Sequence, residues 1–191
     1  MCLTSLMTRP AQTLHFSVPT QRQWMDHMTR RLGDDPMKHP MFGDIETLGP
    51  WTAYIRTMDQ ALAERDPDAS VRAWRQAYSA ALSDPGWLGL LTVATASLRL
   101  REFPGCARVA VARARETYWI AFFRARQQHS LDGVLSVAVA FDSLGDCAAL
   151  EQSMRIAEVL ARRTGEVAAV DRVRVFIERL ADQTGMANQE P

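Results

Sequence analysis

Residues 132–163 read DGVLSVAVAFDSLGDCAALEQSMRIAEVLARR. In both halves of this stretch, apolar residues recur at steps of three and four, which places them on one face of a helix. The two apolar sets are Val134, Leu135, Ala138, Phe141 and Leu144, and then Leu150, Met154, Ala157, Leu160 and Ala161. The stretch therefore predicts two amphipathic helices that pack against each other.

The turn between these helices is specified by local chemistry. Gly145 suits the left-handed conformation that ends a helix, because it has no Cβ to clash there. Asp146 can then cap the next helix by accepting a hydrogen bond from a free backbone N–H, and the Arg162–Arg163 pair lies where the helix dipole favours cations. Neither helix can bury its apolar stripe alone, so the pair needs neighbouring helices.

The rest of the chain repeats the same unit more loosely. We predict further helices over residues 51–65, 69–83, 87–101, 106–128 and 166–181, separated by turns that contain Pro or Gly. Asp68 is the expected cap of the helix over 69–83. This gives a helical-repeat domain over 51–183 and a polar tail over 184–191.

Residues 1–50 differ in composition and are predicted to form an irregular N-terminal arm. They hold six of the nine Met, three of the four His and five of the nine Pro. A short helix is expected over 21–32. The histidines His15, His27 and His39 could suggest a soft-metal site, but their spacing matches no ligand motif, and Met beside Trp24 is more typical of packing.

The helix pairs resemble tetratricopeptide-like repeats over residues 51–163. Ala73, Ala77, Ala80 and Pro85 fit the second helix of such a repeat, and Ala107, Val111 and Ala114 repeat that spacing 34 residues later, as in that family. The resemblance implies an all-α fold, a short superhelical stack of antiparallel helix pairs. A plain helical bundle is the alternative, because Glu64 and Leu98 stand where the family has an aromatic residue.

By this resemblance, the first helix of each pair lines a concave groove that binds a partner. The residues expected to bind the partner there are Arg65, Arg99, Leu135, Val139 and Asp142. Arg101, Arg108 and Arg115 follow at intervals of seven and form a predicted Arg stripe, which could dock an acidic protein or a nucleic-acid backbone, or could be a solvated face. An acidic protein or peptide is the partner we expect, and self-association is a further option.

Composition narrows the class of protein. The formal net charge is zero, which gives no global attraction for nucleic acid or a membrane surface. Between Arg99 and Arg126, however, seven Arg stand against two Glu, and 21 of the 22 basic residues of the chain are Arg. Three widely spaced cysteines, Cys2, Cys106 and Cys147, do not form a disulfide framework, so we expect a cytoplasmic protein.

No motif of an enzyme is present: the chain has no Gly-rich phosphate loop, no Gly-x-Ser-x-Gly elbow and no His-Glu-x-x-His. Cys106 and Cys147 fall in the first turns of predicted helices, where a thiol can be activated, but small buried cysteines are also common. We expect a non-catalytic adaptor or scaffold without a catalytic residue, cofactor or metal. The alternative is a small-molecule-binding or catalytic domain with an aromatic pocket near Trp119, Phe122 and Phe123.

Overall fold

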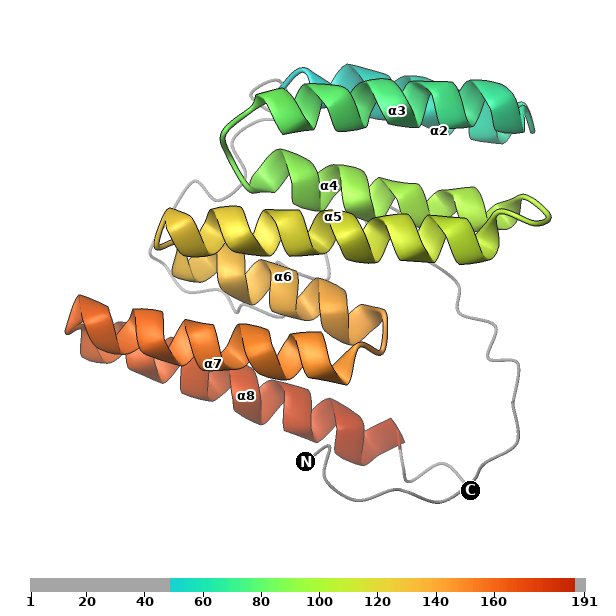
Figure 1. Ribbon diagram of the computed structural model, residues 1–191. Coiled ribbons are helices and arrows are strands. Elements are labelled where there is room, and N and C mark those ends of the chain that lie inside the picture. Colours follow the sequence, from blue (N-terminus) through green and yellow to red (C-terminus); the bar gives the residue numbers. More distant parts are fainter. Residues whose placement is uncertain (1–48, 188–191) are drawn as a thin grey trace. The chain divides into compact units, whose positions relative to one another are not determined.

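The structure, a computed structural model, describes residues 49–187 and the side chains of residues 49–180. This part of the chain is all-helical and contains no strand (Figure 1). Its elements are α2 (Trp51–Ala63), α3 (Pro67–Ser83), α4 (Leu88–Ser97), the short 3-10 helix η2 (Leu98–Glu102), α5 (Ala107–Gln127), α6 (Leu131–Ser143), α7 (Cys147–Thr164) and α8 (Val167–Ala187). The predicted arm, with its helix over 21–32, lies outside the described residues apart from 49 and 50.

These helices belong to two compact units. The N-terminal unit contains residues 49–85 and 89–117 of the described chain, and the C-terminal unit contains residues 86–88 and 118–187. Helix α5 supplies its first half to one unit and its second half to the other.

In the N-terminal unit, α2 and α3 pack side by side (Figure 1). The large buried side chains come from α2, whereas α3 buries small ones such as Ala73 and Ala77, which permit close approach of the two helices. Trp74 is the exception on α3. Its indole Nε1 donates a hydrogen bond to the carbonyl of Val93, at 3.2 Å, and so ties α3 to α4 in the interior.

Several predicted boundaries in this unit differ from the structure. The helix predicted over 51–65 ends at Ala63. Helix α3 begins at Pro67 and is capped by Asp66, whose carboxylate accepts from the backbone N–H of Ala69 at 2.9 Å. Asp68 instead lies in the first turn. Asp66 is the better cap because its backbone is extended and because proline, which lacks an N–H, fits the first helical position. The helix predicted over 87–101 ends at Ser97 and tightens into η2.

In the C-terminal unit, α6 is buried on every side from Gly133 to Phe141. The second half of α5 packs against it, with the Tyr118 and Phe141 ring centroids 5.9 Å apart. Helix α7 also packs on α6, and α8 packs on α7 (Figure 1). An ion pair between Asp132 and Arg172 joins the start of α6 to α8.

The predicted turn before α7 is confirmed. Gly145 has a φ of 70°, and the carboxylate of Asp146 accepts from the backbone N–H of Ala149 at 3.3 Å. The last predicted boundary is corrected, since α8 continues to Ala187 and the first residues of the predicted tail are helical. Within residues 49–187, no helix has the length and apolar character needed to cross a bilayer.

Replacing Ala138 with Trp is expected to destabilise the protein by about 1–3 kcal/mol or more, because Ala138 is fully buried in α6 and an indole there overpacks the core. The melting temperature measures the effect. Ala168→Trp, at an exposed site on α8, is the matched control and should leave the melting temperature nearly unchanged. Equal melting temperatures for the two variants would contradict the burial of α6.

Gly133→Ala is expected to destabilise the protein although alanine is the better helix former. A Cβ at position 133 would lie 2.7 Å from the Cβ of Ala125 and 2.8 Å from the Trp87 ring. Helix propensity favours alanine by about 1 kcal/mol, but overpacking costs about 1–3 kcal/mol, so the clash should prevail. Urea unfolding gives the sign, and adding Ala125→Gly should recover part of the loss. A more stable Gly133→Ala variant would contradict the close approach of α6 to α5.

Candidate functional site

Aromatic side chains from α5 and α6 form a cluster in the C-terminal unit. The ring centroid of Trp119 lies 4.9 Å from that of Phe141, 5.4 Å from that of Phe122 and 5.9 Å from that of Phe123. Phe122 and Phe141 are fully buried, so the rings fill the space around Trp119. Trp119 is half-buried, and Phe123 is the most exposed of these rings, with 49% of its surface accessible to solvent.

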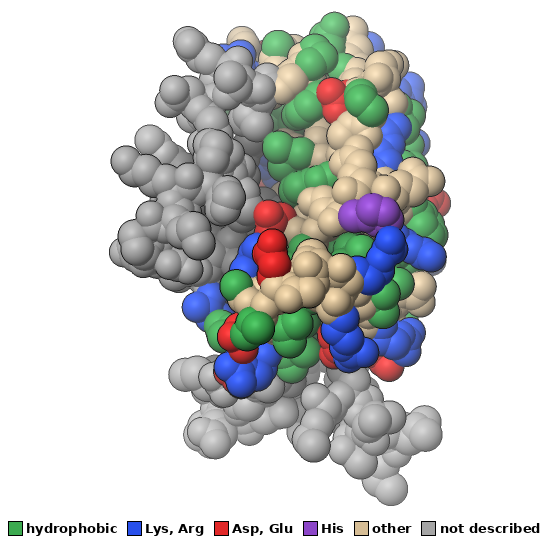
Figure 2. All heavy atoms as spheres, turned by 90° about the vertical axis from the view of Figure 1, so that its left-hand side faces the viewer, with side chains coloured by type: hydrophobic (Ala, Val, Ile, Leu, Met, Phe, Trp, Pro, Cys, Tyr) green, Lys and Arg blue, Asp and Glu red, His purple; other side chains and the backbone are tan. Residues whose placement is uncertain are grey.

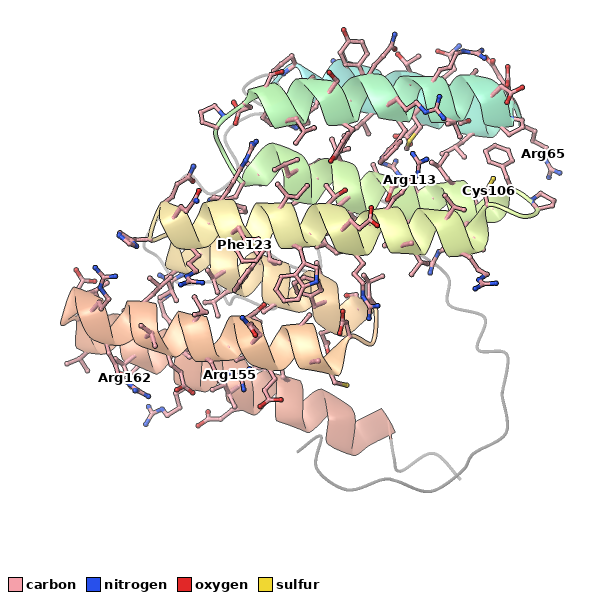
Figure 3. All side chains as sticks on the ribbon, in the orientation of Figure 1. Arg65, Cys106, Arg113, Phe123, Arg155 and Arg162 are labelled. Carbon is pink, nitrogen blue, oxygen red and sulfur yellow. The ribbon has the colours of Figure 1, made fainter. Side chains whose placement is uncertain are left out.

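Phe123 borders a groove between α5 and α7, which we call the α5–α7 groove. The Phe123 side chain extends from the side of α5 that faces α7 (Figure 3). The groove has a volume of about 430 Å³. Its lining residues are Phe123, Arg126, Gln127 and His129 from α5 and the turn after it, and Ile156, Val159, Leu160 and Arg163 from α7. The floor is therefore apolar, and Val159 is as exposed as Phe123.

The rim of the groove is basic. Arg126 and Arg163 line it together with His129, and no acidic residue does. Neither arginine forms an ion pair with a described residue. Figure 2 shows basic side chains (blue) gathered beside the histidine (purple) on this face. An apolar floor with two available guanidinium groups suits a ligand that combines an apolar side chain with carboxylates.

A second depression, of about 440 Å³, lies between α7 and α8. Its apolar part comes mainly from α8, and its charged side chains are two glutamates and two arginines. The lining residues are Glu158, Ala161, Arg162, Val170, Val173, Arg174, Ile177 and Glu178. In contrast to the α5–α7 groove, the charges around this depression are balanced.

A charged ridge on α7 lies at the edge of this depression. We call it the α7 ridge; its residues are Glu151, Arg155, Glu158 and Arg162. Two ion pairs form along it, from Arg155 to Glu151 at 3.0 Å and from Arg162 to Glu158 at 2.9 Å. Each pair joins residues one helical turn apart, as is usual on a solvated helix.

The predicted Arg stripe is not a single helical face. Arg101 lies on η2, where its Nε donates to the carbonyl of Leu98 at 3.2 Å, whereas Arg108 and Arg115 lie on the exposed surface of α5. The chain turns between the two elements at Gly105, whose φ is 81°. The interval of seven residues therefore crosses a turn and does not keep the three side chains in register.

The residues predicted to line a concave groove are divided between the two units. In the N-terminal unit, Arg65 is exposed in the turn after α2, and Arg99 is ion-paired with Asp59. In the C-terminal unit, Leu135 and Val139 are each only 5% exposed. The side chains of Leu135 and Val139 therefore belong to the core of the C-terminal unit and not to an open groove. Asp142, near the end of α6, is half-buried.

The described cysteines are free thiols. Cys106 precedes α5 and is half-buried, and Cys147, the first residue of α7, is exposed. Among residues 49–180, no three His, Cys, Asp or Glu side chains come together in a way that could hold a metal ion. Cys2 and the histidines of the arm lie outside the described residues.

The sequence predicted an aromatic pocket near Trp119, Phe122 and Phe123, and of these residues Phe123 lines the α5–α7 groove. The wall from α7 was not predicted, although one signal for it exists. Ile156, Val159 and Arg163 follow at helical intervals on α7, beside the buried stripe of Ala157 and Leu160. This second stripe widens the apolar face of α7 beyond what one neighbouring helix covers. The opposite wall of the groove comes from α5, and no local pattern indicates which face of α5 it meets.

Comparison with known proteins gives no relative for this chain: a scan of protein-family models, a search of curated proteins and a search of solved structures each found no match.

Proposed function

We propose that this protein is a non-catalytic interaction module, an adaptor or accessory factor, that holds an acidic partner protein in the α5–α7 groove. The observation that carries the proposal is the exposed pair Phe123 and Val159, set between Arg126 and Arg163 without an acidic neighbour among the lining residues. Aromatic and arginine side chains are the types most often found at the centre of protein interfaces.

Different residues of the groove supply affinity and specificity. Covering a large apolar side chain completely is worth about 1.5–3 kcal/mol, so the exposed parts of Phe123 and Val159 supply part of the attraction for an apolar anchor. Arg126 and Arg163 then select a partner whose carboxylates flank that anchor, because guanidinium–carboxylate hydrogen bonds are charge-assisted and directional. An amphipathic acidic helix or an extended acidic peptide has this combination.

We also propose that the helix pairs stack in a tetratricopeptide-like manner. The pairs α2–α3 and α6–α7, with short turns and small buried residues such as Ala77 and Ala138, support this arrangement. The proposed site nevertheless differs from the predicted one. It lies between α5 and α7, each the second helix of its pair, and not along the first helices that carry Leu135 and Val139.

The free thiols of Cys106 and Cys147 support a reducing compartment, and we propose a cytoplasmic location on that basis. A second candidate function is the binding of a small apolar anion in the same groove. The volume of about 430 Å³ favours it, because small-molecule sites commonly span about 300–1,000 Å³. The groove is open to solvent along Phe123, which fits an extended partner better.

Reversing both groove arginines, in an Arg126→Glu/Arg163→Glu variant, is expected to reduce capture of the partner from native lysate at least tenfold while the fold is kept. Two attractive contacts become repulsive, and exposed substitutions of this kind usually change stability by no more than about 0.5 kcal/mol. Quantitative mass spectrometry of the captured proteins, with a melting curve for each variant, is the measurement.

Two matched double reversals complete the design. Arg72→Glu/Arg75→Glu, on the exposed surface of α3, carries the same change of charge and should retain the partner. Loss of the partner only in an Arg108→Glu/Arg115→Glu variant would assign docking to the exposed face of α5 and reject the groove. A saturable thermal shift with small apolar anions, without any stoichiometric protein, would favour the second candidate.

A further inference from the structure

The charge order of the α7 ridge has a symmetry that solvation of the helix does not require. The signs alternate from Glu151 to Arg162 as minus, plus, minus, plus, and the intervals between the four residues are four, three and four. All four side chains are exposed, at 69% and 63% for the first pair and 42% and 70% for the second. Figure 3 shows that Arg155 and Arg162 extend from the same side of α7.

Read from either end, the intervals of the ridge are the same, while the charges are inverted. A two-fold axis through the midpoint between Arg155 and Glu158 therefore places every residue opposite its counter-charge. Glu151 meets Arg162 of the partner subunit, and Arg155 meets Glu158 of the partner subunit. Of the six possible orders of two acids and two arginines at these positions, the same axis brings like charges together in two, and the order of the ridge is one of the four that are self-complementary.

We propose that the α7 ridge is a two-fold self-association surface, on which two copies of this chain pair their α7 helices in antiparallel orientation. Four ion pairs form across the axis, two from each copy. A carboxylate has two oxygens and a guanidinium group five N–H donors, so each side chain can keep its intrahelical partner and accept the new one. The zero net charge of the chain adds no general repulsion between copies.

Exposed apolar side chains beside the ridge provide apolar surface that can be buried between two copies, which ion pairs alone do not provide. Val170 and Ile177 stand beside the ridge, on α8, and are 45% and 40% exposed. Surface ion pairs alone contribute little, and pairing of the ridges brings these apolar flanks toward the second copy.

The intrahelical ion pairs by themselves explain less than the observed pattern. A Glu followed four residues later by an Arg stabilises an isolated helix wherever the pair is placed. Two such pairs in the same orientation always give this charge order, but they need neither a common face nor an exposed valine or isoleucine beside them. The inference also goes beyond the proposed function, since neither Arg126 nor Arg163 belongs to the ridge.

The test uses variants of the full chain with a uniform ridge charge. Glu151→Arg/Glu158→Arg makes the ridge entirely basic, and Arg155→Glu/Arg162→Glu makes it entirely acidic. In low-salt sedimentation equilibrium, the wild type is expected to form a dimer, and each uniform variant should self-associate at least tenfold more weakly. An equimolar mixture of the two variants should recover the dimer, because opposite ridges then attract each other.

A variant with all four ridge charges reversed, the fourfold variant, distinguishes the effect of charge order from the effect of net ridge charge. Reversing all four residues gives the order plus, minus, plus, minus, which is again self-complementary, so this variant should form a homodimer. It should fail to exchange with the wild type, because like charges then meet across the axis. Glu102→Arg/Glu116→Arg, at exposed acids outside the ridge, is the control for net charge and should dimerise as the wild type does.

A monomeric wild type at the highest concentration reached would overturn the proposal. Self-association of both uniform variants at wild-type strength, or free exchange of the fourfold variant with the wild type, would overturn it equally. Circular dichroism verifies the fold of every variant. If a uniform variant loses helix, subunit exchange between the fourfold variant and the wild type is the deciding test. The fourfold variant keeps an opposite-charge pair at each intrahelical position, so its helix should be retained.

Discussion

Burial of α6 is the constraint on which the C-terminal unit depends. From Gly133 to Phe141, every residue of this helix is buried, so α6 has no face to offer water and requires cover on all sides. The second half of α5 and the buried side of α7 supply part of that cover. Gly133 allows close contact with Ala125 of α5 and with Trp87, which precedes α4, because a Cβ at position 133 would meet both. Because α5 and α7 both pack against α6, the groove between them is formed as a consequence of its burial.

Local chemistry made the helix pair over 132–163 predictable. Gly145 and Asp146 set the turn through backbone conformation and one hydrogen bond, and neither depends on the rest of the fold. Where two residues compete for one role, sequence was less decisive. Asp66 and Asp68 can both cap a helix, and the extended backbone at Asp66 together with Pro67 determines the outcome.

The candidate site was harder to predict because it depends on tertiary contacts. Leu135 and Val139 have the spacing of a groove lining, but the same spacing describes a buried helix, and both are in the core. The interval from Arg101 to Arg108 looks regular in sequence but crosses the turn at Gly105. Phe123 and Val159 stand 36 positions apart, and only their packing around α6 brings them to one groove. The charge order of the α7 ridge can be read directly from the sequence, but the exposure of its side chains is known only from the structure.

Helix α7 serves three surfaces because its sides differ in chemistry. Its inner side carries small or apolar residues such as Ala157 and Leu160, one flank carries Ile156 and Arg163, and the ridge carries alternating charge. If copies pair through the ridge, each assembly carries two α5–α7 grooves. A partner with two acidic segments then gains effective concentration for its second contact without any new interaction. Both proposed surfaces rely on exposed charges, so added salt is expected to weaken the proposed partner binding and self-association together. A change at the ridge that preserves the groove would reduce affinity for such a bivalent partner and leave a single acidic peptide unaffected.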